Sequence, residues 1–160
     1  MSDPFMAAKM EIEMFKYSDK KAFAKWAEGK WTHFSRQAPS DGGGVPQKCY
    51  YNAFTMASAD ATHKLYVGYA LDAELPIALQ HAWTVDDGGA VHDCTPRWSQ
   101  KTNVSYYGVH VPLELAEMIF DYDTKHGQPP STNDFFADIS WALTQQGAQV
   151  DTGFLDFCVQ

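Results

Sequence analysis

The chain is poor in cysteine, in basic residues and in long apolar runs, and each shortage excludes a class of protein. Its three cysteines, Cys49, Cys94 and Cys158, are too few and too scattered for a disulfide framework, and no Cys-x-x-Cys pair occurs. We therefore expect reduced thiols. No apolar run approaches the ~20 residues of a membrane span, and the N-terminal segment lacks the basic and then apolar pattern of a signal peptide. These absences predict a cytoplasmic protein without a membrane span.

Basic residues are outnumbered by acidic ones. The sequence holds 12 lysines and arginines against 20 aspartates and glutamates, which gives a formal net charge of -8. Such a charge repels phosphate backbones and anionic lipid headgroups. Neither nucleic acid nor a membrane surface is therefore an expected partner.

The remaining composition indicates one folded domain. Hydrophobic residues make up 45% of the 160 residues and charged residues only 20%, so the chain can bury a core and is not expected to be disordered. The order of the patterns predicts an α+β fold in which helices pack on a small antiparallel sheet. We expect a single domain of residues 1–160, with its core at about residues 38–112 and helical additions on both sides.

Helical spacing occurs on both sides of this core and within it. Residues 10–34 place aromatic side chains among charges and predict two helical pieces, the first beginning near Glu11, with Ser18 as a cap between them. A further helix is expected to start close to Cys49, because Pro46 suits a first turn and apolar residues follow at helical intervals.

Two more helices are expected in the C-terminal third. One spans Leu113 to Tyr122 and is closed by Gly127 and two prolines. The last begins after Ser131 or Thr132 and carries the aromatic residues that follow.

Between the helices, three short segments are rich in aromatic and β-branched residues, which is typical of strands. They lie at about residues 65–70, 81–85 and 90–95. The stretch of residues 38–47 concentrates glycine, proline and serine and is expected to be a loop that leads to Cys49.

A thiol, an imidazole and a carboxylate follow one another along this core. Cys49 opens the expected helix, and His81 and Asp93 lie on the two arms of an expected hairpin. Thiolate catalysis requires these groups, because the thiolate attacks, the imidazole moves the proton and the carboxylate orients the imidazole. A helix N-terminus and a nearby imidazolium both favour the thiolate. We therefore predict that the three residues form a catalytic triad.

The hairpin register decides whether this triad can form. A three-residue loop of residues 86–88 pairs His81 with Asp93 and groups the neighbouring apolar side chains on the same face. A two-residue loop of residues 87–88 instead sets His81 opposite Cys94 and gathers two histidines and a cysteine as a candidate metal site. We favour the first register, because it forms one continuous apolar surface.

This run of features resembles the transglutaminase-like branch of the papain-like cysteine enzymes. The resemblance covers about residues 49–96 and lies in CYYNAF, KLYVGYA and HAWTVDDGGAVHDCTP. In that family a cysteine opens a core helix, the next strand often ends in Gly-Tyr, the histidine stands in His-Ala-Trp, and the aspartate lies on the neighbouring strand. Cys49, Gly68-Tyr69, His81-Ala82-Trp83 and Asp93 match these positions.

The sequence departs from that family at Cys94-Thr95-Pro96, where Pro-Thr more often follows the aspartate. The resemblance implies a papain-like or transglutaminase-like core and a Cys-His-Asp hydrolase or acyltransferase that attacks a carboxamide or peptide bond and forms a thioester. Water resolves the thioester in a peptidase or amidase, and an amine resolves it in a transglutaminase. The expected partner is a protein or peptide substrate, and we expect neither a cofactor nor a metal.

Four further residues are candidates for the oxyanion site or the substrate cleft. The Gln47 side chain, or the backbone N–H of Cys49 itself, could stabilise the oxyanion that forms on attack. Asn52 lies one helical turn from Cys49 and could assist the site, although a solvated or capping amide is the simpler interpretation. Tyr69 and Trp83 are expected to form the core or the cleft wall.

Two other interpretations stay open. His92, Cys94 and His110 could suggest zinc, although their spacing matches no standard zinc pattern. Alternatively, a non-catalytic binding or inhibitory protein could keep the fold and hold a partner with its aromatic surface. A thiol-directed covalent probe separates such a protein from an enzyme.

Overall fold

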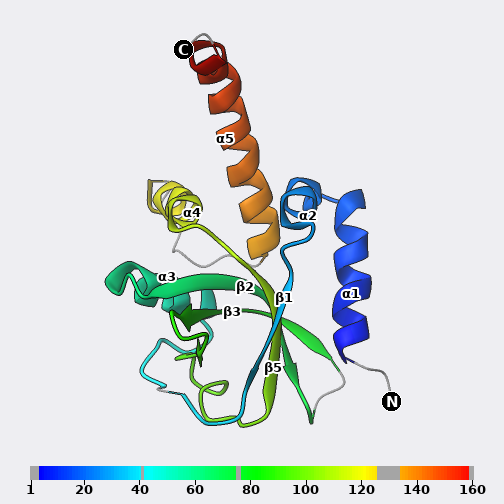
Figure 1. The fold of residues 1–160 in the computed structure, drawn as a ribbon, viewed down its shortest axis with the longest axis vertical. Helices are drawn as coiled ribbons and strands as arrows, with labels where there is room; N and C mark the ends of the chain where they lie inside the picture. Colours follow the sequence, from blue (N-terminus) through cyan, green and yellow to red (C-terminus); the bar gives the residue numbers. More distant parts are fainter. Residues whose placement is uncertain (1–3, 41, 75–76, 126–133, 159–160) are drawn as a thin grey trace.

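Five helices and a curled five-stranded antiparallel sheet make up the fold in the computed structural model, which describes residues 4–40, 42–74, 77–125 and 134–158 (Figure 1). The predicted α+β class is thereby confirmed. In chain order the elements are α1 (Pro4–Met14), a 3-10 turn η1 (Phe15–Tyr17), α2 (Lys21–Ala27), β1 (Thr32–Arg36), α3 (Cys49–Ala59), β2 (His63–Asp72), β3 (Ala78–Asp86), β4 (Val91–His92), β5 (Val104–His110), α4 (Leu113–Lys125) and α5 (Phe135–Cys158).

The strands lie side by side in the order β1-β5-β2-β3-β4, and every neighbouring pair is antiparallel. In the central strand β2, Gly68 lies opposite both His81 and Gly108. A Cβ atom on Gly68 would collide with the carbonyl oxygen of Tyr107, and one on Gly108 would lie 2.5 Å from the Trp83 ring. Glycine at position 108 therefore gives the Trp83 ring room to lie over the sheet, and glycine at position 68 avoids a clash with the backbone of β5.

The two faces of the sheet carry separate apolar clusters, because side chains alternate along a strand. One face, the helix-covered face, packs against all five helices, which contribute among others Ala8, Phe23, Ala53, Ile119 and Phe136. The other, the aromatic face, holds a smaller cluster around Trp83, Trp98 and Tyr106. His81 points to the aromatic face, since it lies two residues from Trp83 on β3.

The N-terminal helices differ in detail from the prediction. The first helix begins at Pro4 rather than near Glu11. Ser18 lies between η1 and α2 as expected, where its hydroxyl donates a hydrogen bond to the Phe15 carbonyl. Ser18 is thus the C-cap of η1, as a cap between the two pieces, whereas the N-cap of α2 is Lys20.

The prediction of helix up to residue 34 is wrong, because residues 32–36 form strand β1. β1 pairs with β5, from Thr32 opposite Gly108 to Arg36 opposite Val104. Its partner lies far away in the sequence, and the spacing of nearby aromatic residues cannot reveal such a pairing. Neither β1 nor β5 was among the expected strands, and β1 lies outside the expected core of residues 38–112.

The elements around the site follow the prediction more closely. α3 begins at Cys49, and β2 and β3 contain the two expected strands at residues 65–70 and 81–85. The third expected strand, at residues 90–95, is reduced to the two residues of β4. The described residues between 38 and 47 form neither helix nor strand, in line with the expected loop.

The β3–β4 hairpin has a three-residue loop, but the loop is displaced by one residue from the favoured prediction. The backbone N–H of Asp86 donates to the carbonyl of Ala90 at 3.0 Å, and Gly89 takes the left-handed position with a φ of 85°. The Asp86 carboxylate accepts the N–H groups of Gly88 and Ala90 at 2.9 and 3.0 Å. These hydrogen bonds stabilise the loop of residues 87–89.

Both registers that the sequence suggests are therefore wrong. Val85 pairs with Val91, whereas the favoured prediction sets it opposite Gly89. The residue opposite Val85 therefore lies two positions further along the chain than the favoured prediction has it. Because side chains alternate with a period of two, this even displacement keeps His81 and Asp93 on the same face, the aromatic face.

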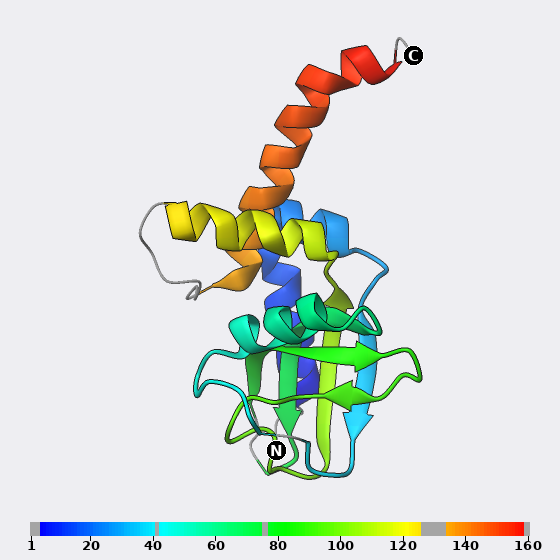
Figure 2. The ribbon, with the colours of Figure 1, turned by 90° about the vertical axis from the view of Figure 1, so that its left-hand side faces the viewer.

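The C-terminal part contains the two expected helices. α4 begins at Leu113 as predicted, whereas the expected closure at Gly127 and the expected start after Ser131 or Thr132 lie outside the described residues. α5 begins at Phe135 and extends away from the sheet (Figure 1 and Figure 2). None of the described helices is both long and apolar enough to cross a membrane.

Candidate functional site

The thiol of Cys49 lies at the start of α3 and is half-buried. The preceding residue, Lys48, is the N-cap, and its side chain makes no hydrogen bond to the helix. No N-cap side chain therefore occupies the backbone N–H groups of the first turn, which carry the positive end of the helix dipole. An anion near Cys49, whether a thiolate or an oxyanion, is favoured there.

The imidazole of His81 joins this thiol to a carboxylate. His81 is 2% exposed, and its Nε2 atom lies 2.7 Å from Oδ2 of Asp93. Since Asp93 occupies Nε2, the other ring nitrogen, Nδ1, is the one left for Cys49, which also acts on the pKa of His81. Burial alone would lower the pKa of His81, but the charge of Asp93 and the hydrogen bonds with Asp93 and Cys49 raise it to about 10. The imidazole is therefore a cation at neutral pH.

The carboxylate of Asp93 is buried and held by several donors. Its Oδ2 atom accepts the Tyr106 hydroxyl at 2.8 Å in addition to His81, and its Oδ1 atom accepts the backbone N–H of Thr95 at 3.4 Å. The backbone N–H of Asp93 donates to the Ser40 hydroxyl at 3.1 Å. The bonds to the carboxylate oxygens replace the water that a buried carboxylate lacks, and together with the bond to Ser40 they fix the direction in which Asp93 faces His81.

Aromatic rings enclose the imidazole–carboxylate pair. The ring centroids of Trp98, Tyr106 and Trp83 lie 5.0, 6.3 and 6.5 Å from that of His81. Apolar walls reduce screening by water, which strengthens the attraction between His81 and Asp93. The buried indole N–H of Trp83 has no hydrogen-bond partner among the described residues. Trp83 thus forms a wall of the site, in line with the cleft or core role expected for it.

The other two candidates near Cys49 differ in what they do. Gln47 is exposed and has a left-handed φ of 63°, so it turns the chain into α3, and its role at the oxyanion stays a prediction. Asn52 is buried, and its amide bonds both backbone groups of Val45 at 2.8 and 2.9 Å and the Thr95 hydroxyl at 3.0 Å. Asn52 therefore fastens the loop before Cys49 to the segment after Asp93.

Tyr69 belongs to the core, which is one of the two roles expected for it, and does not form a wall of the cleft. Tyr69 is fully buried on the helix-covered face, where its ring lies against Trp31 and Phe136. It pairs with Gln80, the neighbour of His81 on β3, and the two-residue period of a strand sends it to the opposite face.

Sequence reasoning missed two residues of the site, Tyr106 and Arg36. Tyr106 comes from β5, which was not recognised as a strand, and Arg36 comes from β1. Arg36 Nε donates to the Tyr106 hydroxyl at 3.1 Å. No motif marks either residue, although the alternation in Val-Ser-Tyr-Tyr-Gly-Val-His was a strand signal that could have placed Tyr106 on a sheet face.

Among the described residues, no cluster of three or more histidine, cysteine or acidic side chains has the geometry of a metal site. His92 lies on the face opposite to His81, where its Nε2 atom is 2.8 Å from Oδ2 of Asp86 and its ring centroid is 4.5 Å from that of His63. The metal site expected from the alternative register, which needs His81 and His92 on one face, therefore does not form.

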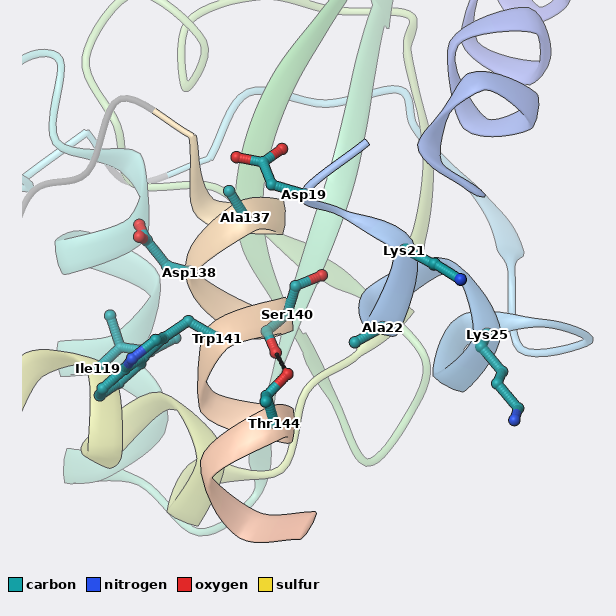
Figure 3. Close-up of a pocket in the computed structure, with 10 residues that line it drawn as sticks. All are labelled: Asp19, Lys21, Ala22, Lys25, Ile119, Ala137, Asp138, Ser140, Trp141 and Thr144. Atoms are coloured by element: carbon teal, nitrogen blue, oxygen red, sulfur yellow. Dashed lines mark hydrogen bonds between the residues drawn. The ribbon is translucent and has the colours of Figure 1, made fainter. Parts of the chain in front are cut away.

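A cavity of about 790 Å³ lies between α2, α4 and α5, and none of the triad residues lines it (Figure 3). Its charged side chains do not converge, since Lys21 and Lys25 point away from Asp138 and Trp141 in Figure 3. The Ser140 hydroxyl is already used, because it accepts the backbone N–H of Phe23 at 2.8 Å. We assign no chemistry to this cavity.

The structure thus brings together Cys49 from α3, His81 from β3 and Asp93 from the segment after β4. Comparisons with protein-family models, with curated proteins and with solved structures found no match in any of the three. The resemblance to transglutaminase-like enzymes stays a prediction from the motifs.

Proposed function

We propose that the protein is a cysteine-nucleophile enzyme that acts on a carboxamide or peptide bond through a thioester on Cys49. The observation that carries this proposal is the buried His81–Asp93 pair, with 2.7 Å between Nε2 and Oδ2, together with the half-buried Cys49 thiol, which acts with Asp93 to raise the pKa of His81 to about 10. An imidazolium beside a thiol stabilises the thiolate, which is the form that attacks a carbonyl carbon.

The reaction then runs in two steps. The Cys49 sulfur forms a bond to the carbonyl carbon, and the oxyanion is stabilised by the backbone N–H groups at the start of α3. His81 Nδ1 gives its proton to the leaving nitrogen, so the C–N bond breaks and an amine or ammonia departs. Water or a second amine attacks the thioester, His81 takes the proton, and the Cys49 sulfur leaves as the thiolate.

The nature of the acceptor sets the type of enzyme. Water makes it a peptidase or amidase, and an amine makes it a transglutaminase. As parts of the same proposal, the fold is a papain-like or transglutaminase-like core, the partner is a protein or peptide substrate, and the protein works in the cytoplasm, where its thiols stay reduced.

Alkylation of each cysteine by iodoacetamide, followed by peptide mass spectrometry as a function of pH, tests the proposal. At pH 6 an ordinary thiol with a pKa of ~8.5 is less than ~1% thiolate. We expect Cys49 to react at least about tenfold faster than Cys94 at that pH, and to lose this advantage in His81→Ala. His92→Ala is the matched control, because His92 lies on the other face of the hairpin.

If Cys49 is inert, or follows Cys94 across the pH range in both the native protein and His81→Ala, the catalytic proposal is wrong. The protein is then better understood as a non-catalytic binding or inhibitory protein. If His92→Ala lowers the rate as much as His81→Ala does, the effect comes from the fold and not from the imidazole beside the thiol.

A further inference from the structure

We infer that Tyr106 is a positioning residue for the proposed triad and that Arg36 sets the direction in which its hydroxyl donates. This inference rests on the proposed function and extends the site beyond its three recognised members. The relevant contacts are the Tyr106 hydroxyl to Asp93 Oδ2 at 2.8 Å and Arg36 Nε to the Tyr106 hydroxyl at 3.1 Å.

The direction of the hydrogen bonds follows from the chemistry of the groups. A guanidinium can only donate, so the Tyr106 oxygen must accept from Arg36. A hydroxyl has one proton, which is then left for Asp93, an acceptor. The series therefore runs one way, from Arg36 through Tyr106 to Asp93, and Asp93 in turn receives the Nε2 proton of His81. This order leaves Nδ1 of His81 as the nitrogen that serves Cys49.

Arg36 is itself locked in place. It is only 6% exposed, and its terminal nitrogens donate to the carbonyls of Ala38, Trp98 and Lys101 at 2.7, 2.7 and 2.9 Å. The guanidinium therefore cannot turn away from Tyr106 without breaking several buried hydrogen bonds. Because Arg36 lies in β1, its backbone is held by the sheet, and its side chain in turn holds the Tyr106 hydroxyl in a fixed position.

Tyr106 is the strongest support that Asp93 has besides His81. The other donor to the carboxylate, the backbone N–H of Thr95, is longer, at 3.4 Å. Burial raises the pKa of Tyr106 most, and the charge of Asp93 raises it further, whereas Arg36 lowers it. The net effect is a raised pKa, so the Tyr106 hydroxyl stays protonated and can donate to Asp93. Without this donor the buried carboxylate is poorly solvated, and His81 loses a well-placed counter-ion.

The test is the pH profile of Cys49 alkylation in Tyr106→Phe, which keeps the ring and removes the hydroxyl. We expect the rate at pH 6 to fall about threefold to tenfold and the profile to move toward that of an ordinary thiol. Tyr107→Phe is the matched control, because Tyr107 is the next residue on β5 and packs against Trp31 and Phe5 on the other face. It should leave the profile unchanged.

Replacement of Tyr106 by 3-fluorotyrosine keeps both ring and hydroxyl and makes the hydroxyl a stronger donor, so it also covers the case in which Tyr106→Phe fails to fold. We expect Cys49 in this variant to stay at least as reactive at pH 6 as in the native protein. A loss of reactivity in the fluorinated variant, or an unchanged profile in folded Tyr106→Phe, overturns the role of Tyr106. A native protein in which Cys49 is not activated at all overturns the proposed function instead.

Discussion

At the scale of single residues, the charge of His81 is set by its neighbours. Burial disfavours the imidazolium, but Asp93 and Cys49 outweigh that effect, so the folded protein holds the His81 proton more tightly than the unfolded chain does. A group that binds its proton more tightly in the folded state stabilises that state as long as the proton stays bound. The free energy of unfolding should therefore depend on pH through the titration of the His81 imidazole.

We predict that the stabilisation from His81 is fully present below pH 6.5 and is lost as the pH rises through its folded pKa, which is raised from 6.5 to about 10. The loss can reach about 1.4 kcal/mol for each pH unit between these values. Urea unfolding of Cys49→Ala and of Cys49→Ala/His81→Gln measures it, and the Cys49→Ala background removes the titration of the thiol. A difference between the two variants that does not change with pH would contradict this prediction.

The proximity of Cys49, His81 and Asp93 was predictable because each of the three residues carries a local signal. Cys49 lies at a helix start, and the relation between His81 and Asp93 depends only on the parity of a short hairpin. Arg36 carries no such signal, and the alternation around Tyr106 indicates a strand but not the strand with which it pairs. They reach the site only because two strands distant in sequence pair in the sheet, and nothing around either residue indicates that pairing.

At the scale of elements, the position of Cys49 depends on how the loop of residues 42–48 is held. Gly44 donates its backbone N–H to the carbonyl of Cys94 at 3.0 Å, and Asn52 holds both backbone groups of Val45. The loop therefore lies against the segment that follows Asp93. Through these contacts, Cys49 and Asp93 keep a fixed relation, although they come from different elements.

Gly44→Ala should disturb this contact. The added Cβ atom would lie 2.7 Å from the Cys94 carbonyl oxygen and 2.7 Å from Cγ of Asn52, so the backbone has to shift. We expect a loss of about 1–3 kcal/mol in the free energy of unfolding, measured in urea, together with slower alkylation of Cys49 at pH 6.

Gly89→Ala provides the control. Its φ of 85° is strained for alanine, but no atom lies within 4 Å of the added Cβ, so the cost of about 1–2 kcal/mol stays within the hairpin loop. The alkylation rate of Cys49 should not change. Equal slowing in both variants would mean that overall stability, and not the position of the loop, controls the thiol.

The elements themselves were predictable to different degrees. α3, β2 and β3 were expected in place because hydrophobic period and turn residues are local properties. The prediction of helix over residues 10–34 includes part of β1 because aromatic side chains stand among charges throughout that segment. Pairing with β5 overrides that tendency.

At the scale of the whole molecule, the terminal helices complete the core and do not merely flank it. Phe136 of α5 is fully buried and stacks on Phe23 of α2 at 4.9 Å between ring centroids. Its ring also lies 5.1 Å from Phe15 and 5.6 Å from Tyr69 of β2. One side chain thus joins both ends of the chain to the central strand.

Phe136→Ala should destabilise the protein as a unit. We expect a loss of about 3–5 kcal/mol, since a buried ring is replaced by a cavity, and a single transition in urea by both circular dichroism and tryptophan fluorescence. Thr144→Ala on the exposed side of the same helix is the control and should change the free energy of unfolding by less than about 0.5 kcal/mol. Two separate transitions would show that residues 38–112 fold independently of α5.

The parts of the site are separated by very different lengths of chain. His81 and Asp93 are 12 residues apart, whereas Arg36 and Tyr106 are 70 residues apart. The entropy lost on closing a loop grows with its length, and contacts between distant residues slow folding. We expect the hairpin that joins imidazole and carboxylate to form early during folding and β1 to dock late. A refolding chain would then hold its acid–base pair before it holds the arginine and tyrosine that keep that pair in position.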